Sequence, residues 1–86
     1  MKIKIINAKG LHARASAKFA ETCEEFNASI SVTFEGMSAN GDSIMGLMML
    51  GAAMGSEIDV VAQGAQADEA LIAIKALVDD YFGEGG

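Results

Sequence analysis

The 86-residue sequence is poor in cysteine, histidine and basic residues. It has one Cys, one His, and six Lys and Arg against twelve Asp and Glu. The single Cys23 cannot form an internal disulfide bond, which fits a reducing cytoplasm. One histidine and one cysteine cannot supply the usual zinc ligands, so we expect neither a metal nor a cofactor. A formal net charge of −6 disfavours nucleic acid as a partner, because phosphate contacts require a basic surface.

Long apolar runs are also missing. No run approaches the ~20 residues that a bilayer-spanning helix needs, and Met1–Ile6 lacks the apolar centre and cleavage site of a signal peptide. We therefore expect a cytoplasmic protein without a membrane partner. The chain is still 51% hydrophobic, which argues against disorder and predicts one packed domain over residues 1–86.

Hydrophobic periodicity predicts the order strand, helix, strand, strand, helix, strand, helix. Alternating apolar residues mark the strands, and three- and four-residue spacings mark the helices. The predicted strands span residues 2–6, 29–34, 37–39 and 57–62, and the predicted helices span 13–25, 43–50 and 68 onward. Glu35 and Gly36 are expected to form the turn between the second and third strands. This order is typical of an α+β fold in which helices cover one face of a four-stranded, mainly antiparallel sheet.

The last predicted helix opens with Asp68 and Glu69, whose carboxylates suit the positive end of a helix dipole. Its expected buried stripe consists of Leu71, Ile74, Val78 and Phe82. The tail that follows, residues 83–86, contains three glycines and is expected to fray.

The helix predicted from Ser43 has apolar residues on two sides. One stripe is expected to contact the core, namely Leu47, Leu50, Gly51 and Met54. Ile44, Met45 and Met48 lie on another side, and a chain of this size has no second core to receive them. Adaptable methionine side chains on an exposed patch are typical of surfaces that bind several partners. A helix that is buried on all sides is the alternative.

The sole histidine, His12, lies in the run Gly10-Leu11-His12-Ala13-Arg14, between a predicted strand and a predicted helix. The first-turn amides of a helix lack intrahelical partners and carry the positive end of its dipole, so they favour an anion such as phosphate. A neutral imidazole is a nucleophile, and a guanidinium can clamp phosphoryl oxygens. The motif therefore favours a histidine that accepts a phosphoryl group. A surface histidine or a helix cap is the alternative.

Ser43 stands at the start of the second predicted helix. An N-cap is the ordinary role for a serine there, and Asp42 could serve instead. A phosphate on Ser43 would add ~−1.5 to −2 charges at a helix N-terminus, where the fold tolerates it, so its effect would fall on a partner surface. The residues alone leave both interpretations open.

Two separated motifs make the sequence similar to the HPr family, the histidine-containing phosphocarrier proteins of the bacterial phosphoenolpyruvate-dependent phosphotransferase system. The first motif is the run around His12. The second is Asp42-Ser43-Ile44-Met45-Gly46-Leu47-Met48-Met49-Leu50-Gly51. The resemblance covers nearly all of the chain. It implies an open-faced β-sandwich, with a four-stranded antiparallel sheet and three helices on one face.

The resemblance also implies a function. His12 would take a phosphoryl group from Enzyme I through Nδ1 and pass it to an acceptor of the EIIA type, with Arg14 on the phosphoryl oxygens. Ser43 would be phosphorylated by HPr kinase/phosphorylase, which would weaken docking to Enzyme I. The implied docking surface consists of Ala13, Ala17, Ile44, Met45 and Met48. Such a protein is a phosphoryl-transfer intermediate rather than an enzyme, and we expect a monomer.

The sequence departs from the family pattern at one position. Many family members have proline directly after the motif arginine, where this chain has Ala15. Alanine keeps good helix propensity, so the cap geometry is expected to survive with a looser loop.

The sequence leaves two alternative functions open. One alternative is a mainly regulatory, nitrogen-type phosphotransferase component without sugar transport. The other is a small hydrolase such as an acylphosphatase, for which the loop after the first strand offers only Asn7, Lys9 and Gly10.

Overall fold

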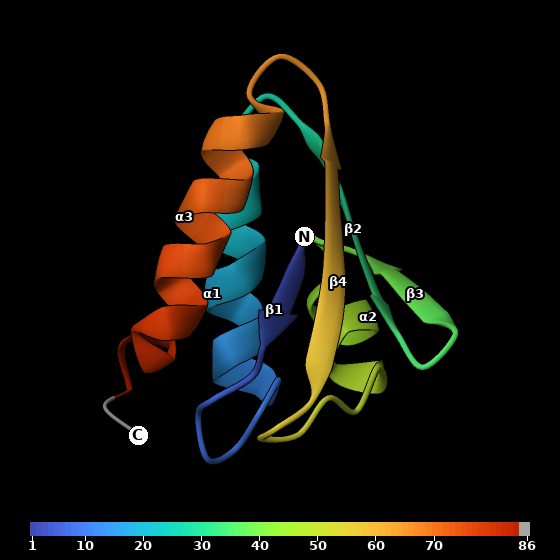
Figure 1. Cartoon of the computed structure of the whole chain (residues 1–86), viewed down its shortest axis with the longest axis vertical. Coiled ribbons are helices and arrows are strands. Elements are labelled where there is room, and N and C mark those ends of the chain that lie inside the picture. Colours follow the sequence, from blue (N-terminus) through green and yellow to red (C-terminus); the bar gives the residue numbers. More distant parts are fainter. Residues whose placement is uncertain (85–86) are drawn as a thin grey trace.

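The computed structural model describes residues 1–84 (Figure 1). Its elements in chain order are β1 (Lys2–Lys4), α1 (Ala13–Glu24), β2 (Ser29–Phe34), β3 (Met37–Asn40), α2 (Ile44–Met49), β4 (Glu57–Gln63), α3 (Ala67–Asp79) and a 3₁₀ turn (Tyr81–Gly83). The strands form one antiparallel sheet in the order β1-β4-β2-β3, and the helices cover one of its faces. The predicted α+β fold and the predicted element order are confirmed.

The β2–β3 hairpin forms as predicted. Phe34 pairs with Met37, so that Glu35 and Gly36 alone make the turn. Their φ angles are 49° and 81°, and two positive φ angles in a two-residue loop give the turn whose twist matches that of the flanking strands. β1 ends at Lys4 rather than at Ile6, where the alternation had placed its end.

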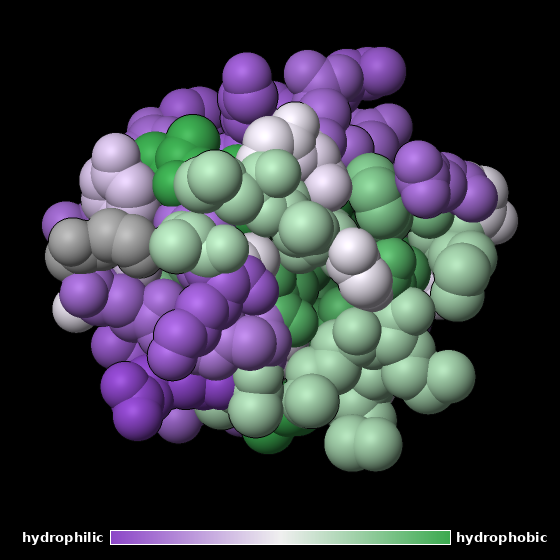
Figure 2. Space-filling view, turned by 90° about the horizontal axis from the view of Figure 1, so that it is seen from below, coloured by the Kyte–Doolittle hydropathy of each residue, from purple (hydrophilic) through white to green (hydrophobic). Residues whose placement is uncertain are grey.

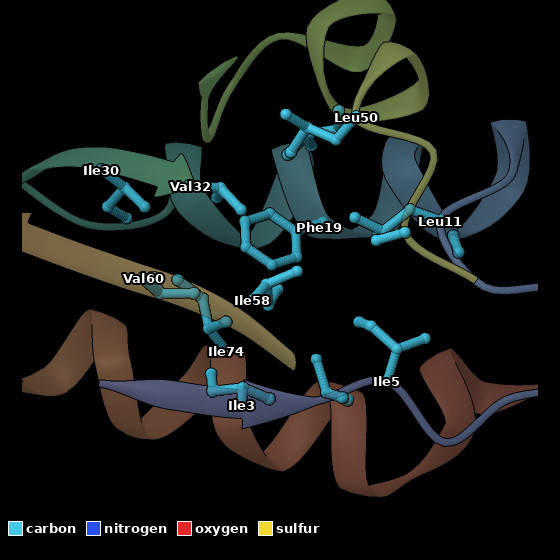
Figure 3. Packing of buried hydrophobic residues seen from close by; sticks show 14 of the residues in the cluster. Ile3, Ile5, Leu11, Phe19, Ile30, Val32, Leu50, Ile58, Val60 and Ile74 are labelled. Carbon is cyan, nitrogen blue, oxygen red and sulfur yellow. The ribbon is translucent and has the colours of Figure 1, made fainter. Parts of the chain in front are cut away.

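The core lies between the sheet and the helices. Figure 3 shows the ring of Phe19, from α1, among Val32 and Ile58 of the sheet. Phe19 and Phe82 are the two largest fully buried side chains of the described chain. Full burial of such a side chain contributes about 1.5–3 kcal/mol. This packing sets the position of α1 on the sheet. It therefore also sets the position of His12, the N-cap residue of that helix.

The end of α2 differs from the predicted apolar stripe. Leu47 and Leu50 are buried as expected, but Gly51 is exposed and Met54 is 62% exposed. The helix ends at Met49, and Gly51, with a φ of 69°, turns the chain away from the helix axis. The prediction that Gly51 and Met54 contact the core is therefore wrong, because it extended the helical spacing past the end of the helix.

The end of α3 differs in a similar way. Ile74 and Val78 are buried, Leu71 is only half-buried, and the helix stops at Asp79. Phe82 does reach the core, but through left-handed backbone: Tyr81 and Phe82 have φ angles of 55° and 53°. Such angles cost about 1–2 kcal/mol per non-glycine residue, and the burial of Phe82 offsets this cost. The buried stripe of α3 thus ends before Phe82.

The expectation that residues 83–86 fray is wrong for the two that the structure describes. The Gly83 N–H donates to the Asp80 carbonyl at 2.9 Å, and the Glu84 N–H donates to the Tyr81 carbonyl at 2.9 Å. Gly85 and Gly86, which the same expectation covered, lie outside the described residues.

Candidate functional site

The loop before α1 is fixed against the segment that follows α2. Gly10 has a φ of 62°, and the Leu11 N–H donates to the Ala52 carbonyl at 3.0 Å. The Leu11 side chain is buried. A backbone this close to another chain segment leaves no room for a side chain at Gly10. The sequence therefore folds this loop into one defined path, which delivers His12 to the beginning of α1.

His12 is the N-cap residue of α1, with extended backbone angles (φ −77°, ψ −177°). Its carbonyl accepts the Ser16 N–H at 2.8 Å, which closes the first turn. Its side chain makes no capping hydrogen bond, so the ring does not occupy the first-turn amides of the helix. Those amides carry the positive end of the helix dipole. The ring is 26% exposed, which makes it accessible without leaving it free of contacts.

The carboxylate of Glu84 lies beside the His12 ring, although 72 residues separate the two along the chain. The Nε2 atom of His12 is 2.8 Å from Oε2 and 3.0 Å from Oε1 of Glu84. Asn7, which is fully buried, donates from Nδ2 to the Gly10 carbonyl at 2.9 Å and lies 3.5 Å from Oε1 of Glu84. Three separate parts of the chain therefore meet at the ring.

The surroundings of Glu84 favour its charged form. The hydrogen bond from His12 is the main reason that the pKa of Glu84 is lowered, and the charges of His12 and Arg14 act in the same direction. Partial burial of the carboxyl group opposes these effects and is outweighed. The carboxylate beside the ring is therefore ionised at neutral pH.

Sequence reasoning singled out His12 and Arg14 but did not place Glu84 beside His12, and it named Asn7 only for the hydrolase alternative. The tail had been predicted to fray because of its glycines. The signal that could have found Glu84 is Phe82, since a large aromatic residue two positions before it can anchor the tail in the core. Asn7 gave no such signal.

Arg14 is the second residue of α1 and is exposed. Its guanidinium makes no hydrogen bond or ion pair with any residue in the range 1–84. It lies close enough to Glu84 to lower the pKa of that carboxyl group. A long, unengaged cation beside a histidine at a helix N-terminus can reach an anion bound there.

Ser43 is the N-cap residue of α2, and its Oγ accepts the Gly46 N–H at 3.0 Å. The capping interpretation of this serine is thus correct, and it does not exclude modification. Next to it, Ile44, Met45 and Met48 are 42%, 68% and 37% exposed. The alternative of an α2 that is buried on all sides is wrong.

Apolar side chains gather over much of the end of the molecule seen in Figure 2. Ala13 is exposed and Ala17 half-buried on α1, which packs against α2. The exposed apolar residues of α1 and α2 therefore lie on two helices that are next to each other. Met49 and Met54, which were not among the residues predicted for the exposed side, are also exposed.

Other chemistry finds little support in the described part of the chain. Residues 1–84 contain no group of three or more His, Cys, Asp or Glu side chains that could hold a metal ion. No helix within those residues is long and apolar enough to cross a membrane. Burial raises the pKa of Cys23 to about 12, so its thiol is a poor nucleophile. A surface hollow of about 570 Å³ beside Cys23 and Asp42 contains none of the candidate residues.

Comparison with known proteins identifies the class. Residues 1–80 match the family model described as the phosphotransferase-system HPr component phosphorylation site. The chain belongs to the HPr family, whose members are phosphocarrier proteins of the phosphotransferase system. The resemblance inferred from the two motifs is confirmed.

Individual relatives are similar over almost their whole length. The phosphocarrier protein HPr of Neisseria meningitidis serogroup A is 51% identical over 83 residues, which cover 96% of this chain and 93% of the relative. The phosphocarrier protein NPr of Shewanella violacea is 44% identical, covering 95% and 90%. The crystal structure of an HPr from Thermoanaerobacter tengcongensis has a TM-score of 0.93 at 38% identity, covering 98% and 94%. A second structure from that organism, described as an HPr dimer, has a TM-score of 0.80 at 39% identity, covering 95% and 94%.

Proposed function

We propose that His12 is the phosphoryl acceptor of this phosphocarrier. It would take the group from Enzyme I and pass it to an EIIA-type protein. The observation that carries the proposal is an accessible imidazole at the N-terminus of α1, with the unengaged Arg14 guanidinium two residues away. The first-turn amides and the guanidinium suit the phosphoryl oxygens, and the ring supplies the nucleophile. The protein then acts as a transfer intermediate rather than as an enzyme.

The docking surface proposed for both partners consists of Ala13, Ala17, Ile44, Met45 and Met48. Its support is that apolar side chains, exposed on α2 and exposed or half-buried on α1, lie on two helices that pack against each other, and that His12 is the N-cap residue of α1. Flexible methionines can repack against differently shaped partners, as a carrier that meets two proteins in turn requires. The net charge of −6 would attract partners with a basic rim. A monomer leaves this surface open to each partner, and we propose a single cytoplasmic domain over residues 1–86.

We also propose Ser43 as a site of regulatory phosphorylation by HPr kinase/phosphorylase. Its half-buried side chain lies at the N-terminus of α2, directly before the exposed Ile44 and Met45. A phosphate there would place about −1.5 to −2 charges at the edge of an apolar docking surface. Desolvation of this charge would weaken the complex with Enzyme I and leave the fold intact.

A mainly regulatory, nitrogen-type role is the second candidate, because two of the similar proteins are called NPr and others HPr. The acceptor distinguishes the two. The phosphorylated protein would be mixed with a sugar-specific EIIA and, separately, with a nitrogen-type EIIA, and loss of label from the carrier would be followed in time. Rapid transfer to the sugar-specific acceptor supports sugar transport. Transfer to the nitrogen-type acceptor alone supports regulation, and transfer to neither contradicts the carrier role.

The hydrolase alternative fits this geometry poorly. Asn7, the asparagine that such chemistry would use to position water, is fully buried and donates to the Gly10 carbonyl. Release of free phosphate from an acyl phosphate, lost in Arg14→Ala and kept in His12→Ala, is the result that would favour a hydrolase.

A further inference from the structure

The carboxylate of Glu84 contacts Nε2, one of the two ring nitrogens of His12. We propose that Glu84 is a positioning residue for phosphoryl transfer: it holds the proton on Nε2 of His12 and so reserves Nδ1 for the phosphoryl group. This inference rests on the proposed function of His12. Its geometric basis is the pair of distances from Nε2 to the carboxylate oxygens, 2.8 and 3.0 Å.

The argument begins with the tautomer. A neutral imidazole carries its proton on one nitrogen and a lone pair on the other. A carboxylate can only accept hydrogen bonds, so the nitrogen beside Glu84 must be the one that carries the proton. Nδ1 therefore has the lone pair, and no residue in the range 1–84 donates a hydrogen bond to it. The second ring nitrogen of a working histidine sets which nitrogen reacts.

The second step concerns charge. The Nδ1 lone pair forms a bond to phosphorus, while the bond between phosphorus and the donor nitrogen breaks and its electron pair leaves with the donor. The proton stays on Nε2, so positive charge develops on the ring as the new bond forms. The ionised Glu84 faces that charge directly. A carboxylate that orients an imidazole and stabilises its cationic form serves the same purpose in enzymes that use a catalytic histidine.

The third step concerns how Glu84 is held. The segment Tyr81–Glu84 is anchored by the fully buried Phe82, whose carbonyl accepts a hydrogen bond from Nζ of Lys18 at 2.8 Å. The left-handed angles of Tyr81 and Phe82 set the direction in which the chain leaves the core. Backbone strain that persists at a functional site is commonly part of its design. The charged groups around the Glu84 carboxylate are His12 and Arg14, and Lys18 is bound to the neighbouring backbone.

The regiochemistry of phosphorylation tests this role without any partner protein. Phosphoramidate, a small phosphoryl donor that loses ammonia, would be incubated with the full-length wild type, Glu84→Gln and Glu84→Ala. Glu21→Gln, which removes an exposed carboxylate on α1, serves as the matched control. Because the chain has one histidine, ¹⁵N and ³¹P NMR identify the phosphorylated nitrogen without ambiguity. We expect only the Nδ1 product in the wild type and in Glu21→Gln, and an added Nε2 product in Glu84→Ala.

The ¹⁵N spectrum of the unphosphorylated wild type is expected to show a proton on Nε2 with a strong hydrogen bond, and that signature weakens in both Glu84 variants. With Enzyme I as donor, loss of a charge-assisted hydrogen bond predicts about a tenfold slower transfer in Glu84→Ala, and a smaller loss in Glu84→Gln. An Nε2 product in the wild type, a proton on Nδ1, or variants that match the wild type would overturn the inference. Failure of Enzyme I to label the wild type would instead overturn the proposed function, while the phosphoramidate and NMR results would still decide the role of Glu84.

Discussion

Gly10 and Ala52 approach each other so closely that a Cβ atom built on Gly10 would lie 2.3 Å from the Ala52 carbonyl oxygen. The same carbonyl accepts the N–H of Leu11 at 3.0 Å. The loop that carries His12 is thus locked to the segment between α2 and β4. Ala52 follows α2, the helix that carries Ile44, Met45 and Met48 of the proposed docking surface. The contact therefore fixes the position of the His12 ring relative to the segment that follows this helix.

Substitution of Gly10 tests this contact. Gly10→Ala introduces both a left-handed alanine and a collision with backbone, and is expected to destabilise the fold by more than about 2 kcal/mol. Gly51→Ala is the matched control, since Gly51 has a similar φ of 69° but no heavy atom within 4 Å of its Cβ position. It should cost only about 1 kcal/mol. Urea unfolding monitored by circular dichroism gives both values, and equal losses would contradict the close approach.

Substitutions at Ser43 separate its capping role from its proposed regulatory role. Ser43→Ala removes the acceptor for the Gly46 N–H and should destabilise the protein by about 1 kcal/mol. Ser43→Asp and Ser43→Asn both keep a capping oxygen, but only the aspartate adds a charge beside the apolar surface. Transfer from Enzyme I should therefore slow in Ser43→Asp and not in Ser43→Asn. Equal rates in these two variants would leave Ser43 as a cap only.

The pH dependence of the contact between His12 and Glu84 follows from the lowered pKa of Glu84. The stability that this contact contributes is present above the ordinary glutamate value of 4.5, and it is lost as the pH falls through the lower value of the folded protein. Titration of the Glu84 side-chain carbon by ¹³C NMR should give a midpoint below 4.5. In His12→Ala the midpoint should return toward 4.5, because the hydrogen bond from His12 is the main cause of the shift. A midpoint that does not respond to this substitution would contradict the contact.

The sequence allowed much of this architecture to be predicted, because the informative patterns are local. Strict alternation from Ser29 to Phe34 and the turn at Glu35 and Gly36 define a hairpin without any distant contact. The His12 motif was likewise found from neighbouring residues. The exposure of Met45 followed from a helix that has more apolar faces than one small core can cover.

Features that depend on tertiary packing could not be predicted. Helix periodicity placed Phe82 on the stripe of α3, whereas the chain leaves the helix at Asp79 and reaches the core through left-handed residues. The path of Gly83 and Glu84, and with it the contact to His12, depends on that departure. Propensity favours disorder in a glycine-rich tail, and one buried aromatic side chain outweighs it at Gly83 and Glu84.

The most direct test of the account is phosphorylation of the protein by Enzyme I and phosphoenolpyruvate, measured by intact mass. The wild type should gain one acid-labile phosphate. His12→Ala should gain none and should remain folded, with a melting temperature lowered only by loss of the contact with Glu84, since its α1 backbone contacts are kept. A phosphate that persists in His12→Ala, or a wild type that stays unlabelled while the same Enzyme I phosphorylates another HPr, would contradict the assignment of His12 as the phosphoryl acceptor.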